Sequence, residues 1–208
     1  MKTQNGSHRS RGFSLLELVV VVAIMFVVAA MAMPTMTNAI ADYKLKSTAS
    51  QLVNLLQRAR TESVRANFPV GVLTQVQAGR QVVWVDVSGN GVRDATEPTL
   101  IMPERTTLQT AGFPGDATVG QNPANYRVMP QAPPAAGQFN ARGLPCWMMA
   151  SIVAATQTCR NTDNGNNAQG FVYYIRSDRP FGLAGWAAVV VTPAGRIRST
   201  TWANNSYQ

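Results

Sequence analysis

The hydrophobic pattern of the chain begins with one long apolar run. Residues 13–33 contain a single charged side chain, Glu17. As an α-helix, which rises about 1.5 Å per residue, this run spans roughly 30 Å, the thickness of the hydrocarbon core of a bilayer. Arg9 and Arg11 stand directly before it, and basic residues favour the cytoplasmic side of a membrane. The pattern therefore predicts one membrane-spanning helix, with the rest of the chain outside the cytoplasm.

The pattern changes after Pro34, where apolar residues recur every three or four positions. The stripe consists of Leu45, Ala49, Leu52, Leu56, Ala59 and Ser63. This spacing places it on one face of an amphipathic α-helix. Asn67-Phe68-Pro69 predicts the end of that helix, because proline disfavours helical geometry in the residue before it. We expect the stripe to be the surface on which a β-sheet packs.

Short runs rich in β-branched and aromatic residues follow residue 69 and predict β-strands. The predicted strands are residues 70–76, 81–87, 126–129, 170–176, 186–192 and 197–202. Gln77-Ala78-Gly79-Arg80 separates the first two and predicts a hairpin. Residues 110–145 are rich in Pro and Gly and, apart from the strand at 126–129, predict loop. One long helix followed by an antiparallel sheet predicts an α+β fold.

Composition narrows the possible functions. Of all residues, 46% are hydrophobic and only 13% are charged, which is typical of a folded domain rather than a disordered chain. The lone histidine, His8, lies before the apolar run, so the domain lacks the usual general base and a common metal ligand. No nucleophile–base pair or metal cluster stands out, and the sequence does not predict an enzyme.

Cys146 and Cys159 are the two cysteines of the chain, and a polar segment separates them. Neither neighbours a cluster of carboxylates that would indicate a metal site. In an exported protein, such a pair predicts a disulfide that closes a short loop. The alternative is two free thiols, which an oxidising compartment disfavours.

Residues 86–97 fit the spacing of a calcium-binding loop. The ligand positions fall on Asp86, Ser88, Asn90, Asp94 and Glu97, with Gly91 at the sharp turn. An EF-hand needs flanking helices, however, and here a strand precedes. Asn-Gly is also a strong turn signal, and Asp, Ser and Asn stabilise turns without any metal. The sequence favours a plain turn and leaves calcium as the alternative; no other cofactor is predicted.

Arg196 and Arg198 flank Ile197 directly after a turn signal that contains Gly195. Because side chains alternate along a strand, the two guanidinium groups are expected on one face about 7 Å apart. This matches the spacing of successive phosphates along a nucleic-acid strand, to which arginine donates paired hydrogen bonds. The alternative is a solvated edge strand whose charges discourage aggregation. Further candidates for the same site are Arg176 and Arg179.

An ordinary secretory signal peptide is the other explanation of the apolar run, since Ala30-Met31-Ala32 offers a cleavage site between small residues. The apolar core of such a signal is shorter, however, at about 7–15 residues. A carboxylate such as that of Glu17 is also costly in an apolar segment, by roughly a few kcal/mol, which indicates that it has a function.

The string Arg11-Gly12-Phe13-Ser14-Leu15-Leu16-Glu17 resembles the class III signal of type IV prepilins and type II secretion pseudopilins. The resemblance implies that a prepilin peptidase cleaves after Gly12 and methylates Phe13. It implies that Glu17 meets the N-terminal amine of a neighbouring subunit, since two charges that are each costly alone become tolerable as a pair. It also implies a helix that kinks or melts at Pro34.

Four segments follow from these expectations. They are a leader peptide (residues 1–12), a transmembrane and assembly helix (13–34), the amphipathic half of that helix (35–66) and a globular β-rich pilin domain (67–208). The resemblance implies a single-pass protein of the inner membrane with its domain in the periplasm, which joins a pilus or pseudopilus with other pilin or pseudopilin subunits. Loss of the leader removes three of the 18 basic side chains and none of the ten acidic ones, so the net charge falls from +8 to +5.

Two segments narrow the resemblance to the FimT/GspH branch of this superfamily. They are residues 86–97 after a Trp-bearing strand, and Gly195-Arg196-Ile197-Arg198, which resembles the glycine-arginine-any-arginine signature through which FimT-like pilins bind DNA. This implies a minor type IV pilin that binds DNA without sequence preference, through Gly195, Arg196 and Arg198, and contributes to DNA uptake in natural transformation. The alternative is a GspH-like pseudopilin with a structural role in type II secretion.

Overall fold

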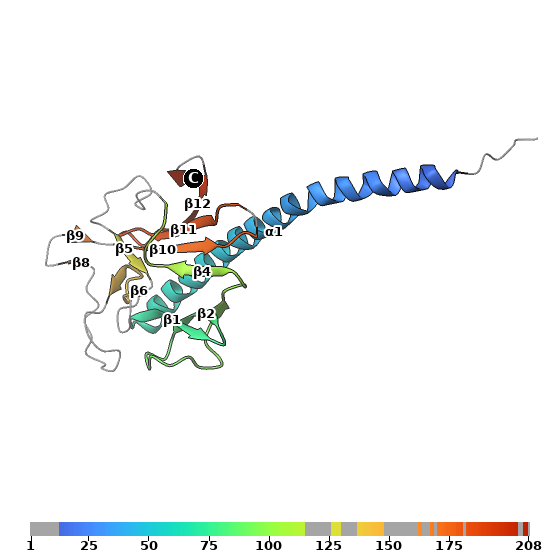
Figure 1. Cartoon of the computed structure of the whole chain (residues 1–208). Helices are drawn as coiled ribbons and strands as arrows, with labels where there is room; N and C mark the ends of the chain where they lie inside the picture. Colours follow the sequence, from blue (N-terminus) through green and yellow to red (C-terminus); the bar gives the residue numbers. More distant parts are fainter. Residues whose placement is uncertain are drawn as a thin grey trace, which may run out of the picture.

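A computed structural model describes residues 13–114, 126–129, 137–147, 162–163, 167–168, 170–180, 182–203 and 206–207. In it, one long helix extends far beyond a domain of β-strands (Figure 1). The predicted α+β architecture is confirmed: the long apolar helix packs on antiparallel sheets.

Helix α1 (Leu15–Ala66) begins and ends at sequence-encoded caps. At its start the Ser14 hydroxyl accepts a hydrogen bond from the backbone N–H of Glu17 at 3.1 Å, which satisfies one of the unpaired amides of the first turn. At its end Asn67 adopts the left-handed conformation with φ of 50°, which lets the chain leave the helix. Pro34 lies inside α1, which remains helical on both sides of it, so the expected melting at this residue does not occur.

The strands form two main sheets. The first sheet has the order β3 (Thr99–Ile101), β2 (Arg80–Asp86), β1 (Val70–Gln77), β6 (Gly137–Phe139) and β7 (Pro145–Trp147). The second sheet has the order β13 (Ser206–Tyr207), β12 (Ile197–Ala203), β11 (Gly185–Val191), β10 (Gly170–Ser177) and β4 (Thr106–Gln109), with β5 (Tyr126–Met129) also paired to β10. A separate short pair consists of β8 (Thr162–Asp163) and β9 (Asn167–Ala168).

All six predicted strands are present, with differences at their ends. The predicted hairpin joins β1 and β2, and both residues of its turn, Ala78 and Gly79, have positive φ, as the common two-residue hairpin turn requires. The sequence did not predict β3, β4, β6 or β7, which are only three or four residues long. The pairing of β5 with β10 is parallel, whereas an antiparallel sheet was expected.

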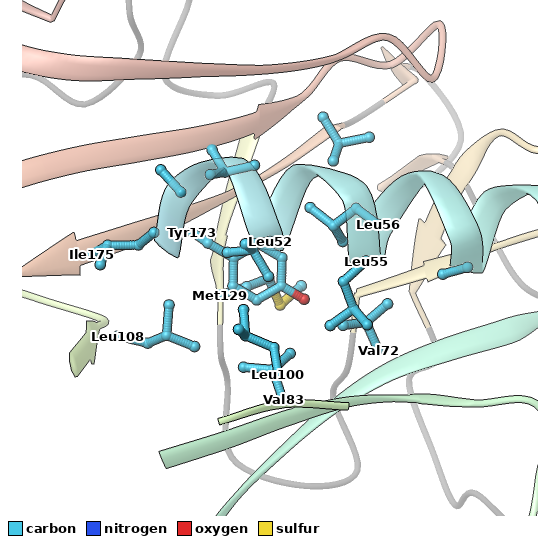
Figure 2. Packing of buried hydrophobic residues seen from close by; sticks show 14 of the residues in the cluster. Leu52, Leu55, Leu56, Val72, Val83, Leu100, Leu108, Met129, Tyr173 and Ile175 are labelled. Atoms are coloured by element: carbon cyan, nitrogen blue, oxygen red, sulfur yellow. The ribbon is translucent and has the colours of Figure 1, made fainter. Parts of the chain in front are cut away.

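The core lies between the amphipathic half of α1 and both sheets. Every residue of the predicted stripe is buried, from Leu45 to Ser63. Figure 2 shows Leu52 and Leu56 of α1 in a cluster with Val72 and Val83 of the first sheet and Ile175 of the second. Leu52 and Leu56 are 0% exposed, and burying each contributes about 1.5–3 kcal/mol to the free energy of folding. Helix α1 thus holds the two sheets together.

Candidate functional site

The N-terminal half of α1 is an exposed apolar surface. Its most hydrophobic stretch is long and apolar enough to cross a membrane, and no part of that stretch is buried. Ala41 is the first buried residue of the helix. Glu17 lies in the first turn of the exposed half, where a carboxylate interacts favourably with the helix dipole. Phe13 is 78% exposed, and Gly12 lies outside the described residues.

Asp86 organises the loop that follows β2. Its side chain is 3% exposed. One carboxylate oxygen accepts hydrogen bonds from the backbone N–H groups of Gly89 at 2.8 Å and Asn90 at 3.2 Å, and the other accepts one from Gly91 at 2.9 Å. Buried carboxylates are stable when several backbone amides solvate them in this way. The loop thus wraps around the Asp86 carboxylate.

Glu97 closes the same loop from its far end. One oxygen of its carboxylate accepts hydrogen bonds from the backbone N–H groups of Val87 at 2.9 Å and Ser88 at 3.3 Å, and the other accepts one from Asp94 at 3.0 Å. The Asn90 side chain in turn donates to Asp94 at 3.1 Å. These carboxylates thus act as acceptors for the backbone, which is the arrangement of the plain turn that the sequence favoured.

The calcium alternative gains no support from this geometry. No group of three or more His, Cys, Asp or Glu side chains suited to a metal ion occurs in the part of the chain that the structure describes. Calcium prefers six to eight oxygen ligands, whereas the oxygens of Asp86 and Glu97 already accept hydrogen bonds from backbone amides. Calcium binding at residues 86–97 stays the untested alternative to a plain turn.

The arginine turn, defined as residues 192–196, is a tight loop before β12. Gly195 donates its backbone N–H to the carbonyl of Thr192 at 2.7 Å, and Thr192 donates to the carbonyl of Arg196 at 2.8 Å. Gly195 has φ of 79°, and a Cβ added to it would lie 2.8 Å from the carbonyl oxygen of Gly143. Only glycine therefore suits this position, both for its backbone conformation and for its close neighbour.

A residue far away in the sequence supports the arginine turn. The guanidinium of Arg60, near the end of α1, donates a hydrogen bond to the carbonyl oxygen of Gly195 at 2.9 Å. Sequence reasoning missed Arg60, because it lies on the helix 135 positions from Gly195 and no local pattern links the two. A contact of this kind is visible only once the helix and the sheet are packed.

The two arginines of the predicted pair differ in environment. Arg196 precedes β12 and is exposed, whereas Arg198 is half-buried. Ile197 packs against the main core, so the expected alternation directs Arg198 to the opposite face of the sheet, in register with Val190. Burial raises the pKa of the Tyr126 phenol, and the positive charge of Arg198 opposes that shift. Arg198 therefore lies on the face of the second sheet that also carries Val190, near Tyr126.

The two further candidate arginines have acidic partners. Arg176 forms an ion pair with Asp178 at 2.8 Å and lies over the Trp186 ring, 5.8 Å from its centroid. Arg179 donates two hydrogen bonds to Asp42 of α1, from Nε at 3.0 Å and from a terminal nitrogen. Arg179 thus links the β10–β11 connection to the helix, which is a structural role that the sequence did not indicate.

Cys146 is a fully buried residue of β7. Its predicted partner, Cys159, lies outside the described residues, so the disulfide between them stays a prediction.

Comparisons with known families match two parts of the chain. Residues 7–33 match the family model of the prokaryotic N-terminal methylation motif. Residues 48–195, well over half of the chain, match the family model of type II transport protein GspH. No curated protein and no solved structure gives a significant match. The two family matches, together with one long apolar helix packed on antiparallel sheets, show that the chain belongs to the GspH/FimT branch of the type IV pilin-like superfamily.

Proposed function

We propose that this chain is a minor pilin that assembles into a filament through α1 and binds DNA weakly and without sequence preference, which contributes to DNA uptake in natural transformation. Prepilin peptidase would cleave after Gly12, and the domain would face the periplasm before assembly. The family supports the coarser part of this proposal, since the methylation motif and the GspH domain belong to subunits that assemble with other pilins or pseudopilins.

One observation carries the assembly role. The apolar half of α1 is exposed in the single chain, yet contains only one charge, Glu17. Such a surface is stable only in a membrane or against other apolar helices. A carboxylate near its start has a natural partner in the N-terminal ammonium of a neighbouring subunit. Helix α1 therefore anchors the subunit first and joins the filament afterwards.

The DNA-binding role rests on the arginine turn. Arg196 is exposed, and no ion pair of its guanidinium occurs among the described residues. A cation held on a rigid turn is suited to a phosphate contact. Because few contacts are available per subunit, we expect micromolar or weaker affinity at physiological salt, so that capture depends on several copies in a filament.

A structural pseudopilin of type II secretion is the second candidate. The match to the GspH family model favours it. The half-buried state of Arg198 and the ion pairs of Arg176 and Arg179 also leave fewer exposed cations for DNA than the sequence indicated. In this role the chain would need α1 and the domain but no nucleic-acid site.

DNA titrations of the full-length chain in detergent separate the two candidates. Replacing Arg196 and Arg198 by Gln keeps most of the side-chain volume and removes both charges. We expect weaker binding of a labelled DNA duplex and a flatter salt dependence, with a slope smaller by about 0.9 for each phosphate that the variant no longer neutralises. Arg80→Gln, at an exposed position in the β1–β2 hairpin, is the matched control. A parent chain that binds no DNA even at low salt would favour the secretion role.

A further inference from the structure

We propose that Arg60 and Arg142 join Arg196 in one site for the phosphate groups of DNA, which we call the three-arginine site. This inference rests on the DNA binding proposed above and deepens it. It replaces the pair of neighbouring arginines on one strand by a cluster that three separate elements bring together: the end of α1, the β6–β7 turn and the arginine turn.

Gly143, Gly195 and Arg60 meet at this site. A Cβ added to Gly143 would lie 3.1 Å from Nε of Arg60, and one added to Gly195 would lie 2.8 Å from the carbonyl oxygen of Gly143. The Arg60 guanidinium also donates to the carbonyl of Gly195 at 2.9 Å. The two turns and the helix are therefore in direct contact, and Arg142 and Arg196 are each the chain neighbour of a glycine at this junction.

Hydrogen bonds within the β6–β7 turn hold the backbone at Arg142. The Asn140 side chain accepts hydrogen bonds from the backbone N–H groups of Arg142 at 2.9 Å and Leu144 at 3.1 Å. The Asn140 backbone donates to the carbonyl of Leu144 at 2.9 Å. Gly143 has φ of 72°, a conformation that glycine adopts without strain. Because the turn is held by its own hydrogen bonds, binding a phosphate requires little ordering of the backbone.

The three arginines differ from Arg65, Arg176 and Arg179 in that no acidic partner occurs for them among the described residues. Arg65, Arg176 and Arg179 form ion pairs with Glu62, Asp178 and Asp42. Within the described part of the chain, Arg60, Arg142 and Arg196 form none. Only one of the five N–H donors of Arg60 is used by Gly195. The three arginines carry positive charge on neighbouring elements, and a polyanion both compensates this charge and accepts hydrogen bonds from the remaining donors.

The site is also far from the membrane. Along α1, Arg60 is about 40 Å from Met33, the end of the apolar run, at 1.5 Å per residue. Arg142 and Arg196 are exposed. A DNA strand could therefore reach the three-arginine site while α1 is embedded in a membrane or a filament.

The test uses the full-length chain in detergent, a labelled DNA duplex and a series of salt concentrations. Arg142→Gln is the main variant, because its side chain is exposed and the fold should be unaffected. We expect severalfold weaker binding at low salt and a salt slope that is flatter by about one. Arg196→Gln should behave alike, and Arg80→Gln should bind as the parent does. Arg60→Gln should weaken binding, and Arg60→Lys should restore part of the loss, since it keeps the charge.

The outcomes separate this inference from the proposed function. If Arg196→Gln weakens binding but Arg142→Gln binds as the parent, the three-arginine site is wrong and DNA binding stands. If Arg142→Gln and Arg80→Gln weaken binding equally, only total charge matters and the site is also wrong. If the parent binds no DNA at low salt, both proposals fail.

Discussion

Single residues determine the conformation of the loop between β2 and β3. Asp86 and Glu97 are both buried, and together they accept hydrogen bonds from six backbone N–H groups of this loop. Removal of a buried acceptor leaves its donors unsatisfied, which costs about 1–3 kcal/mol. The two acidic side chains thus stabilise the conformation of this loop through hydrogen bonds to its backbone.

The first prediction concerns Asp86. Asp86→Ala should lower the free energy of unfolding by about 2–3 kcal/mol, because three backbone amides lose their acceptor. Denaturant unfolding measures this change, and Asp94→Ala, at an exposed position of the same loop, is the matched control with a smaller effect. Calcium should not raise the melting temperature of the parent chain. A calcium-dependent rise that Glu97→Ala abolishes would establish the metal site instead.

The second prediction concerns Tyr173, a fully buried residue of β10. No described residue forms a hydrogen bond with its hydroxyl. Tyr173→Phe should therefore leave the stability at neutral pH unchanged or raise it by up to about 1 kcal/mol, since an unsatisfied polar atom leaves the core.

The same residue predicts a dependence on pH. Burial raises the pKa of Tyr173 above its value in the unfolded chain. The unfolded state therefore releases this proton first, so that stability is complete below about pH 10 and falls as the pH rises above it. Thermal unfolding between neutral and alkaline pH should show a smaller fall for Tyr173→Phe than for the parent; equal falls would assign the effect to other groups.

At the scale of elements, α1 has two halves with different requirements. The first half is exposed and apolar, and the second is held to the sheets at two points by Arg179–Asp42 and Arg60–Gly195. These two contacts lie near the two ends of the packed half, which fixes the direction in which the exposed half leaves the domain (Figure 1).

The third prediction concerns processing and assembly through α1. N-terminal sequencing or intact mass should give a mature chain that begins at N-methylated Phe13; a start at Met33 would indicate an ordinary signal peptide. Glu17→Ala should leave membrane insertion intact but impair incorporation into filaments, because the N-terminal ammonium of the neighbour loses its partner. Glu17→Asp keeps the charge and is the control. Normal incorporation of Glu17→Ala would remove the role assigned to Glu17.

At the scale of the whole molecule, one helix serves two sheets. The first sheet contributes Val72 and Val83 to the common core, and the second contributes Ile175 and Val189. Among the described residues, α1 is the only helix, and it packs on strands of both sheets. The stability of the domain therefore depends on α1. A covalent cross-link that closes one of the long loops would add to this stability.

The fourth prediction concerns the disulfide between Cys146 and Cys159. It would close a loop of 14 residues, counted inclusively, and stabilise the fold by about 3 kcal/mol in the chain-entropy model. Thiol titration of the denatured, unreduced chain should find no free thiol, and reduction should lower the denaturation midpoint. Two titratable thiols before reduction would contradict the pairing.

Local patterns in the sequence determined the helix, its caps, the longer strands and the N-terminal signal. Each of these depends on spacing within a few residues, as in the stripe from Leu45 to Ser63 or the alternation around Ile197. Tertiary structure alone decided the short strands β3, β4, β6 and β7, the parallel pairing of β5 with β10, and the partners of the arginines. Arg60 and Gly195, or Asp42 and Arg179, meet only because α1 packs across the sheets, and contacts between residues so far apart in the chain leave no periodic trace in it.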